Sequence, residues 1–275
     1  MITTPAVTAG PTTGGNSRTR TASTTSGGPD LPPSRAGRGD IHVWAWRTGP
    51  VPDATDLVLL DEVELGRVRR CHHPRDAAAL ARTRAGARRA LGGLLDVPPT
   101  DIALGRRTCP ACGSDRHGPP VLSRPALPDP PGVSLSRTEG CGMLAAGLGT
   151  KVGIDVEALR PVDAEGLAEV VLTERERAHV LGVPEGPVRA LRHFRCWTRK
   201  EAVVKAAGTG LMGTELTRLE VYPEQPGPVR VVLRTGGLPP TSWHVRDIPL
   251  NGPWTAALAH PATPSTPHLT LHTTP

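Results

Sequence analysis

Apolar residues follow two different spacings along this chain. Residues 42–46 alternate as a strand does, whereas apolar residues over 57–70 and 74–94 recur at helical spacing. The second of these helices has a proline at its first position, where the missing amide hydrogen costs nothing. The chain therefore begins with a strand and two helices, followed by a proline-rich stretch over 105–132 that is predicted to be irregular.

The second half repeats this mixture of elements. A helix is predicted over 188–207, and Gly208 is placed to end it. The predicted strands are short and separated by Pro and Gly, and they lie at 133–136, 143–148, 152–156, 218–221, 229–234, 243–246 and 254–258. Helix and strands in each half predict an α+β chain made of two similar α/β halves.

The first forty residues are mostly Thr, Gly, Ser, Pro and Arg, which cannot bury enough apolar surface to offset the entropy lost on ordering. The expected organisation is a disordered leader over 1–40, an N-terminal half over 41–150, a C-terminal half over 151–262 and a tail over 263–275. The leader lacks the apolar segment of a secretory signal, and no stretch has the ~18 apolar residues of a membrane span. Five cysteines then favour reduced thiols, so a cytoplasmic protein is expected.

Almost all of the basic residues in this chain are arginines. The net charge is +6, and the basic residues other than Lys151, Lys200 and Lys205 are all Arg. Eight arginines fall between Arg67 and Arg89 against one acid, which predicts either a solvated helix face or a phosphate-binding face. The few lysines indicate positions that need a compact ammonium rather than a planar guanidinium.

Two carboxylates lie two residues apart in the predicted strand 152–156 and directly after it. Strand geometry points Asp155 and Glu157 to one face, and Ile154 and Val156 to the other. Like charges so close repel unless a cation lies between them, and Mg²⁺ commonly takes one or two protein carboxylates together with substrate phosphates. The alternative interpretation is a pair of solvent-facing acids.

The helix over 188–207 carries a second polar stripe. Trp197, Glu201 and Lys205 are spaced i, i+4, i+8 and share one face. The alternative is a simple surface ion pair between Glu201 and Lys205, but a tryptophan on the same face argues against a wholly solvated stripe. With the strand carboxylates, these side chains are the groups needed to hold a metal-complexed pyrophosphate, in a chain that has neither a Walker loop nor a Rossmann glycine motif.

Two motifs carry a resemblance to a known family. Gly-Ile-Asp-Val-Glu at 153–157 and Trp-Thr-Arg-Lys-Glu-Ala-Val-Val-Lys at 197–205 resemble the two signature motifs of the Sfp-type 4′-phosphopantetheinyl transferases. A looser likeness extends over residues 41–262, and it implies a pseudo-dimeric α+β fold with the active site between the two halves. The resemblance implies a Mg²⁺-dependent enzyme, or one that takes Mn²⁺ in its place, that transfers phosphopantetheine from coenzyme A to a serine of an apo carrier protein and releases adenosine 3′,5′-bisphosphate.

The resemblance also implies roles for individual residues. Asp155, Glu157 and Glu201 would hold the metal, and Glu201 would help to deprotonate the serine. Coenzyme A would be bound by Lys200, Lys205, Arg137, Ser136, Arg75 and His117. Trp197 would pack the helix against the sheet. The implied partners are acyl or peptidyl carrier domains of polyketide or nonribosomal peptide synthesis, with no membrane or nucleic acid and a monomeric chain.

Several positions depart from the family pattern. Arg137 follows Ser136 where many members have histidine, and a permanent cation there can still bind a phosphate. Pro119 and the alanines at 77–79 replace residues that are often basic, so Arg75, Arg82 or Arg84 would have to substitute.

Two other functions stay open from the residues alone. Cys109, Cys112 and His117 have the spacing of half a zinc site, and with the arginine run they suggest a basic nucleic-acid-binding protein. The chain could also be a non-catalytic family member that binds coenzyme A.

Overall fold

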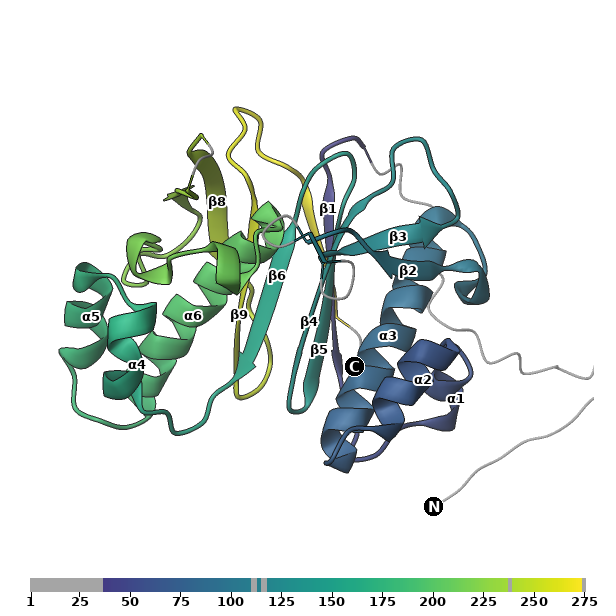
Figure 1. The fold of residues 1–275 in the computed structure, drawn as a ribbon, viewed down its shortest axis with the longest axis horizontal. Coiled ribbons are helices and arrows are strands. Elements are labelled where there is room, and N and C mark those ends of the chain that lie inside the picture. Colours follow the sequence, from purple (N-terminus) through teal and green to yellow (C-terminus); the bar gives the residue numbers. More distant parts are fainter. Residues whose placement is uncertain (1–36, 110–112, 115–117, 237–238, 274–275) are drawn as a thin grey trace, which may run out of the picture. The chain divides into compact units, whose positions relative to one another are not determined.

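Two long helices each cover one four-stranded sheet (Figure 1). This computed structural model describes residues 37–109, 113–114, 118–236 and 239–273, all within the unit Pro33–Pro275. The long helices are α3 (Pro74–Leu95) and α6 (Pro187–Ala207). The α+β prediction is confirmed, while most of the expected leader lies outside the described residues.

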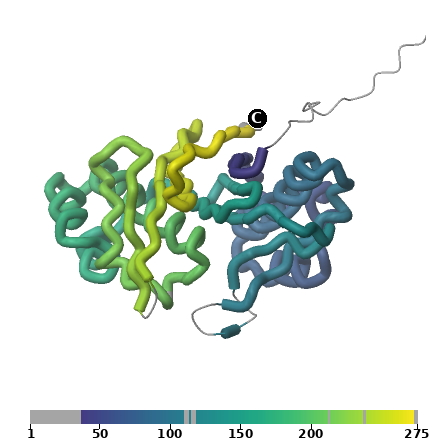
Figure 2. Tube along the Cα trace, turned by 90° about the horizontal axis from the view of Figure 1, so that it is seen from above, coloured from purple at the N-terminus to yellow at the C-terminus, as the bar shows by residue number. Residues whose placement is uncertain are grey.

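The first sheet has the order β10-β1-β5-β4 and the second the order β6-β9-β8-β7. The first contains β1 (Ile41–Arg47), β4 (Gly132–Thr138), β5 (Cys141–Gly147) and β10 (Leu269–Thr273). The second contains β6 (Gly153–Ala158), β7 (Val229–Leu233), β8 (Thr241–Asp247) and β9 (Trp254–Pro261). Strand β10 lies in the expected tail and pairs parallel with β1, as the yellow and purple ends of the trace show in Figure 2.

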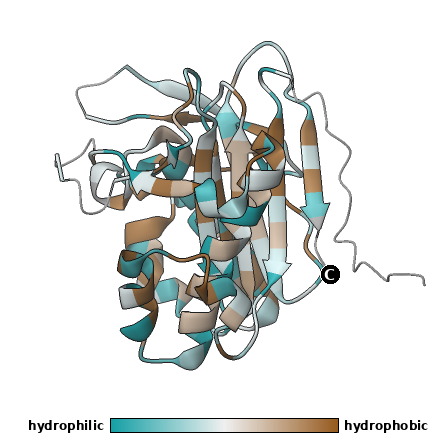
Figure 3. Ribbon diagram, turned by 90° about the vertical axis from the view of Figure 1, so that its right-hand side faces the viewer, coloured by the Kyte–Doolittle hydropathy of each residue, from teal (hydrophilic) through white to brown (hydrophobic). Residues whose placement is uncertain are grey.

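Strand alternation sorts the core into layers. On β1, Ile41 and Val43 face the second sheet, whereas Trp44 and Trp46 face α3. On β9, the even-numbered Ala256 and Leu258 face the first sheet, and the odd-numbered alanines between and after them face α6. The layers therefore run α3, first sheet, second sheet, α6, with brown apolar bands recurring along the strands in Figure 3.

Hydroxyl side chains join the two sheets where β4 runs beside β6. Ser134, Ser136 and Thr138 alternate along β4 and accept hydrogen bonds from the backbone amides of Ile154, Val156 and Ala158 at 3.1, 3.3 and 3.1 Å. Side-chain hydroxyls thus take the place of backbone carbonyls at this seam, and each satisfies an amide of β6.

The remaining helices are short. They are α1 (Ala54–Leu57), α2 (Glu62–Arg69), α4 (Ala164–Val171) and α5 (Glu174–Leu181). The single helix predicted over 57–70 is wrong, because Asp61 and Glu64 form a capping box that starts a new helix. The sequence interpretation also missed α4 and α5, both of which begin at a side-chain cap.

Two strand predictions also need correction. The stretch predicted to be irregular over 105–132 contains most of the hairpin of β2 (Ala103–Arg106) and β3 (Pro120–Arg124). The strand predicted over 218–221 is absent from the described structure, which has a 3-10 turn at Leu216–Arg218 there. No helix within the described residues combines the length and apolar character needed to cross a membrane.

Candidate active site

Strand β6 and helix α6 approach each other unusually closely. A Cβ at Gly153 would lie 2.0 Å from the carbonyl oxygen of Ala202 and 2.4 Å from the amide nitrogen of Ala206, so only glycine allows this contact. The helix ends one turn later at Gly208, which adopts the left-handed conformation with φ of 78°. The close approach brings the polar stripe of α6 onto the carboxylate face of β6.

Lys205 and Asp155 form the central contact of the site. The Lys205 Nζ lies 2.6 Å from Asp155 Oδ1, which is 4% exposed at the residue level. Ser136 Oγ donates to the same Oδ1 at 2.8 Å and accepts from Lys205 Nζ at 3.2 Å. Ser136, which was predicted to bind coenzyme A, is buried and holds Asp155 through this hydrogen bond.

Glu201 lies one turn before Lys205 on α6. Burial, with the nearby negative charge of Asp155 and to a smaller extent Glu157, raises the pKa of Glu201 to about 7, although Lys205 opposes the shift. Glu157 also forms an ion pair with Arg160 at 3.0 Å. Asp155 and Glu157 thus lie close enough to Glu201 for their charges to act on its carboxyl group.

This carboxylate set fits a divalent cation in its donor chemistry. The Oδ2 of Asp155 is buried and has no hydrogen-bond partner, which is costly for a carboxylate unless a cation binds there. The described residues hold no preformed group of three or more metal-ligating side chains. One or two carboxylates with substrate phosphates and water are the usual ligands of Mg²⁺, so a complete protein cage is not required.

Lys200, which was predicted to bind coenzyme A, does not lie with Glu201 and Lys205 in this structure. Its Nζ is fully buried and pairs with Glu176 at 2.7 Å on the other side of α6. The sequence register explains the difference, because Lys200 precedes Glu201 and points away from it around the helix. Trp197 is also placed differently from the prediction, since it packs against the α4–α5 cluster that includes Val180.

The arginine run on α3 is largely engaged inside the protein. Arg84 and Arg88 form ion pairs with buried Glu64, and Arg82 and Arg89 with buried Asp56. These acids precede the run in the sequence, so a count of acids within the run could not reveal them. Four of the eight arginines of the run are thus paired with buried acids of α1 and α2.

Arg75 and Arg137 lie at the outer edge of the site. Arg75 is exposed and pairs with Glu139 in the turn between β4 and β5. Arg137 is also exposed and lines two neighbouring cavities. One of these, of about 410 Å³, has Ser136 in its wall.

Sequence reasoning assigned no part of that 410 Å³ cavity except Ser136 and Arg137, with Arg84 considered as a substitute. Arg67, Arg84 and Arg106 also line it, so four guanidinium groups surround one space. Nη1 of Arg84 and Oγ1 of Thr83 are buried there without hydrogen-bond partners. Unsatisfied donors in a basic cavity fit an anionic ligand.

A second cavity, of about 560 Å³, opens beside Glu201 and Lys205. Its other walls are mainly apolar or backbone, and include Pro119, Leu135 and Leu211. The cavity therefore has a charged end and mainly apolar walls, which suit a ligand with one polar end and an apolar remainder.

Some predicted residues cannot be placed. His117 and Cys112 lie outside the described residues, so the structure does not test the zinc hypothesis or the role of His117. Cys71, Cys141 and Cys196 carry thiols that form no disulfide.

Comparisons with known proteins agree with this geometry. The sequence model of the 4′-phosphopantetheinyl transferase superfamily matches residues 151–259, which contain both motifs. The chain is 28% identical over 190 residues to the 4′-phosphopantetheinyl transferase HetI of Nostoc sp., covering 68% of this chain and 76% of the relative. It is 29% identical over 206 residues to the 4′-phosphopantetheinyl transferase pptA of Paxillus involutus, covering 66% of this chain and 73% of the relative.

The matched region holds Gly153, Asp155, Glu201 and Lys205, which the fold brings to one place. The match over residues 151–259 and this geometry support a member of the 4′-phosphopantetheinyl transferase superfamily.

Proposed function

We propose that this protein transfers the 4′-phosphopantetheine group of coenzyme A to a serine hydroxyl of an apo acyl or peptidyl carrier protein, with Mg²⁺ as cofactor. The observation that carries the proposal is the convergence of Asp155, Glu201 and Lys205 between β6 and α6. The carboxylates of Asp155, Glu157 and Glu201 suit a divalent cation, and the ammonium of Lys205 suits the pyrophosphate bound to that cation.

Residues of this protein would act on both the attacking serine and the leaving phosphate. Glu201 accepts the proton of the incoming serine hydroxyl, whose oxygen forms a bond to the β-phosphorus of coenzyme A. The bond from that phosphorus to the bridging oxygen breaks, and its electrons leave with adenosine 3′,5′-bisphosphate. The ammonium of Lys205 lies at Asp155, in the part of the site where the phosphates would bind. There it neutralises the charge that develops on the phosphates.

A divalent cation, when bound, would supply further charge neutralisation of the pyrophosphate. Asp155 is the first ligand to consider, because its Oδ2 is unpaired, and Glu201 and Glu157 lie near it. Ser136 would keep Asp155 in place through Oδ1 and leave Oδ2 to the ion.

Two cavities suit the remaining parts of coenzyme A. The basic cavity of Arg67, Arg84, Arg106 and Arg137 suits a phosphate of the nucleotide. The mainly apolar cavity beside Glu201 suits the pantetheine arm, which has an apolar body and amide groups.

The test is to incubate the protein with coenzyme A, Mg²⁺ and several apo carrier domains, and to measure the mass of each carrier. We expect one phosphopantetheine group on the carrier serine and none on a Ser→Ala carrier. Coenzyme A binding without any transfer would support the non-catalytic alternative, and transfer without added divalent metal in the presence of a chelator would contradict the role of the cation.

A further inference from the structure

The segment that follows α6 forms part of the wall of the apolar cavity. Gly208, Thr209, Gly210 and Leu211 line this cavity, and Gly208 lies beside Pro119 there. The chain then continues through two single 3-10 turns before it reaches β7, with no sheet pairing in this described stretch. Its position must therefore be set mainly by contacts other than a backbone ladder.

Lys200 supplies the first set of these contacts. Its ammonium donates to the carbonyl oxygens of Leu216 at 2.7 Å and Leu219 at 2.6 Å, while Glu176 binds it at 2.7 Å. Glu176 also accepts from the backbone amide of Val221 at 2.9 Å. Both charged side chains are 0% exposed, so neither can touch a substrate in this structure.

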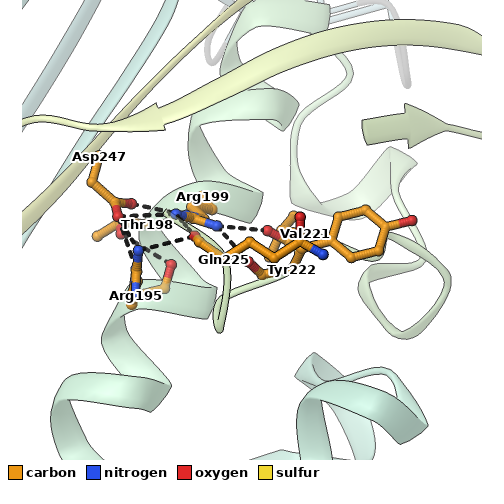
Figure 4. A network of polar contacts seen from close by, with 7 residues as sticks. All are labelled: Arg195, Thr198, Arg199, Val221, Tyr222, Gln225 and Asp247. Carbon is orange, nitrogen blue, oxygen red and sulfur yellow. Dashed lines mark hydrogen bonds and ion pairs between the residues drawn. The ribbon is translucent and has the colours of Figure 1, made fainter. Parts of the chain in front are cut away.

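Arg199 supplies the second set, on the next part of the segment (Figure 4). It donates to the carbonyl oxygens of Val221, Tyr222 and Gln225 at 3.0, 2.6 and 2.9 Å. Asp247 at the end of β8 binds the other side of the guanidinium, at 2.8 and 2.9 Å. The fork of five N–H donors allows one arginine to make all of these bonds.

Arg199 and Lys200 together therefore donate hydrogen bonds to five carbonyl oxygens of the segment after α6. Leu219 and Val221 are also buried in the core under α6, which fixes the same stretch from its apolar side. An ammonium buried with a carboxylate costs desolvation energy, and its hydrogen bonds must offset that cost. Here the bonds go to the segment that continues from the cavity wall.

We propose that Lys200 and Arg199 are positioning residues, which fasten the segment 208–225 to α6 and thereby set the wall of the cavity beside Glu201. The inference rests on the proposed function, in which this cavity receives the pantetheine arm of coenzyme A. Lys200 and Lys205 lie five residues apart on one helix and then have separate roles. Lys205 binds the phosphates, whereas Lys200 holds the segment that forms the cavity wall.

The experiment compares Lys200→Met, Lys205→Met and Lys151→Met, using steady-state kinetics and backbone hydrogen exchange. For Lys200→Met we expect faster exchange of amides within 209–221 and a KM for coenzyme A raised about tenfold, with kcat within about threefold of wild type. Lys205→Met should lower kcat by about 100-fold or more with exchange in 209–221 unchanged. Lys151 is exposed and serves as the control, with both readouts unchanged.

A fall of about 100-fold in the kcat of Lys200→Met, with exchange unchanged, would overturn the proposal, since that is the result of direct contact with the phosphates. If Lys200→Met does not fold, Glu176→Gln replaces it, because Gln keeps the shape of Glu176 while removing its charge. Wild-type exchange rates in 209–221 of Glu176→Gln would also overturn the proposal. If the wild-type protein transfers no phosphopantetheine, the proposed function fails, and hydrogen exchange alone still decides whether Lys200 and Glu176 fasten the segment.

Discussion

The ammonium nitrogen of Lys205 lies 2.6 Å from Oδ1 of Asp155, 50 residues earlier in the chain. The contact exists because Gly153 lets α6 approach β6 closely enough for the two side chains to meet. Ser136 holds the same carboxylate oxygen from β4, so strands of both sheets build one end of the site.

Lys205→Arg tests whether this contact needs a compact cation. The planar guanidinium is larger than an ammonium and cannot occupy the same position between Asp155 and Ser136. We expect kcat/KM for phosphopantetheine transfer to fall by about 10² or more while the melting temperature stays near that of wild type. Full activity in Lys205→Arg would show that only the charge matters.

Gly153→Ala tests the close approach of β6 and α6. The added methyl group would meet the carbonyl of Ala202 at 2.0 Å, which is backbone and cannot turn aside. We expect the free energy of unfolding to fall by about 1–3 kcal/mol or more, measured by urea denaturation. Gly93→Ala in α3 is the matched control: no atom lies within 4 Å of its Cβ, so stability should rise by about 0.5–1 kcal/mol.

Glu64→Gln tests whether the arginine run is held by internal ion pairs. Glu64 is buried with Arg84 and Arg88, so the variant would remove the carboxylate paired with Arg84 and leave Arg88 with that of Asp61 at 3.5 Å. We expect a loss of about 3–5 kcal/mol in the free energy of unfolding. The exposed neighbour Glu62 should tolerate the same change within about 0.5 kcal/mol, and equal effects at both positions would refute the internal pairing.

Acid should loosen the junction of β1 and β10. His42 Nδ1 and His272 Nε2 share a hydrogen bond at 3.1 Å, and burial lowers the pKa of both rings below the ordinary 6.5. Asp40 raises the pKa of His42, and His268 lowers it, but neither exceeds the effect of burial. The folded state therefore favours neutral rings, so this contribution to stability is present above pH 6.5 and is lost as the pH falls through the lowered pKa values.

The measurement is the urea midpoint at pH 8 and pH 5 for wild type and His272→Gln. We expect the wild-type midpoint to fall on acidification, and the variant to lose part of this pH dependence. The same difference between the two pH values in both proteins would contradict the role of the pair.

Much of the site could be predicted because strand and helix periodicity fix which side chains share a face. The alternation of Asp155 and Glu157 against Ile154 and Val156 is a local property, and the structure shows that same division. The end of α6 at Gly208 was equally predictable, because the left-handed conformation of a helix C-cap strongly favours glycine.

The errors concern partners that lie far apart in the sequence. Nothing near Lys200 indicates that it binds Glu176, because the pairing depends on how α5 packs against α6. The segment at 218–221 has the apolar pattern of a strand, yet Arg199 and Lys200 side chains take carbonyl groups that a neighbouring strand would otherwise bind. Similarly, Asp56 and Glu64 become partners of the arginine run only once α1 and α2 dock on α3.

The central claim is that the β6–α6 site carries out phosphopantetheine transfer, and Asp155→Asn tests it most directly. The measurement is the rate at which an apo carrier gains mass from coenzyme A and Mg²⁺, for wild type and for the variant, after circular dichroism has shown that both fold. The account predicts transfer by wild type and a rate lower by about 10²–10³ in Asp155→Asn, because the amide keeps the shape but loses the charge beside Lys205. Equal rates for the two proteins would contradict it.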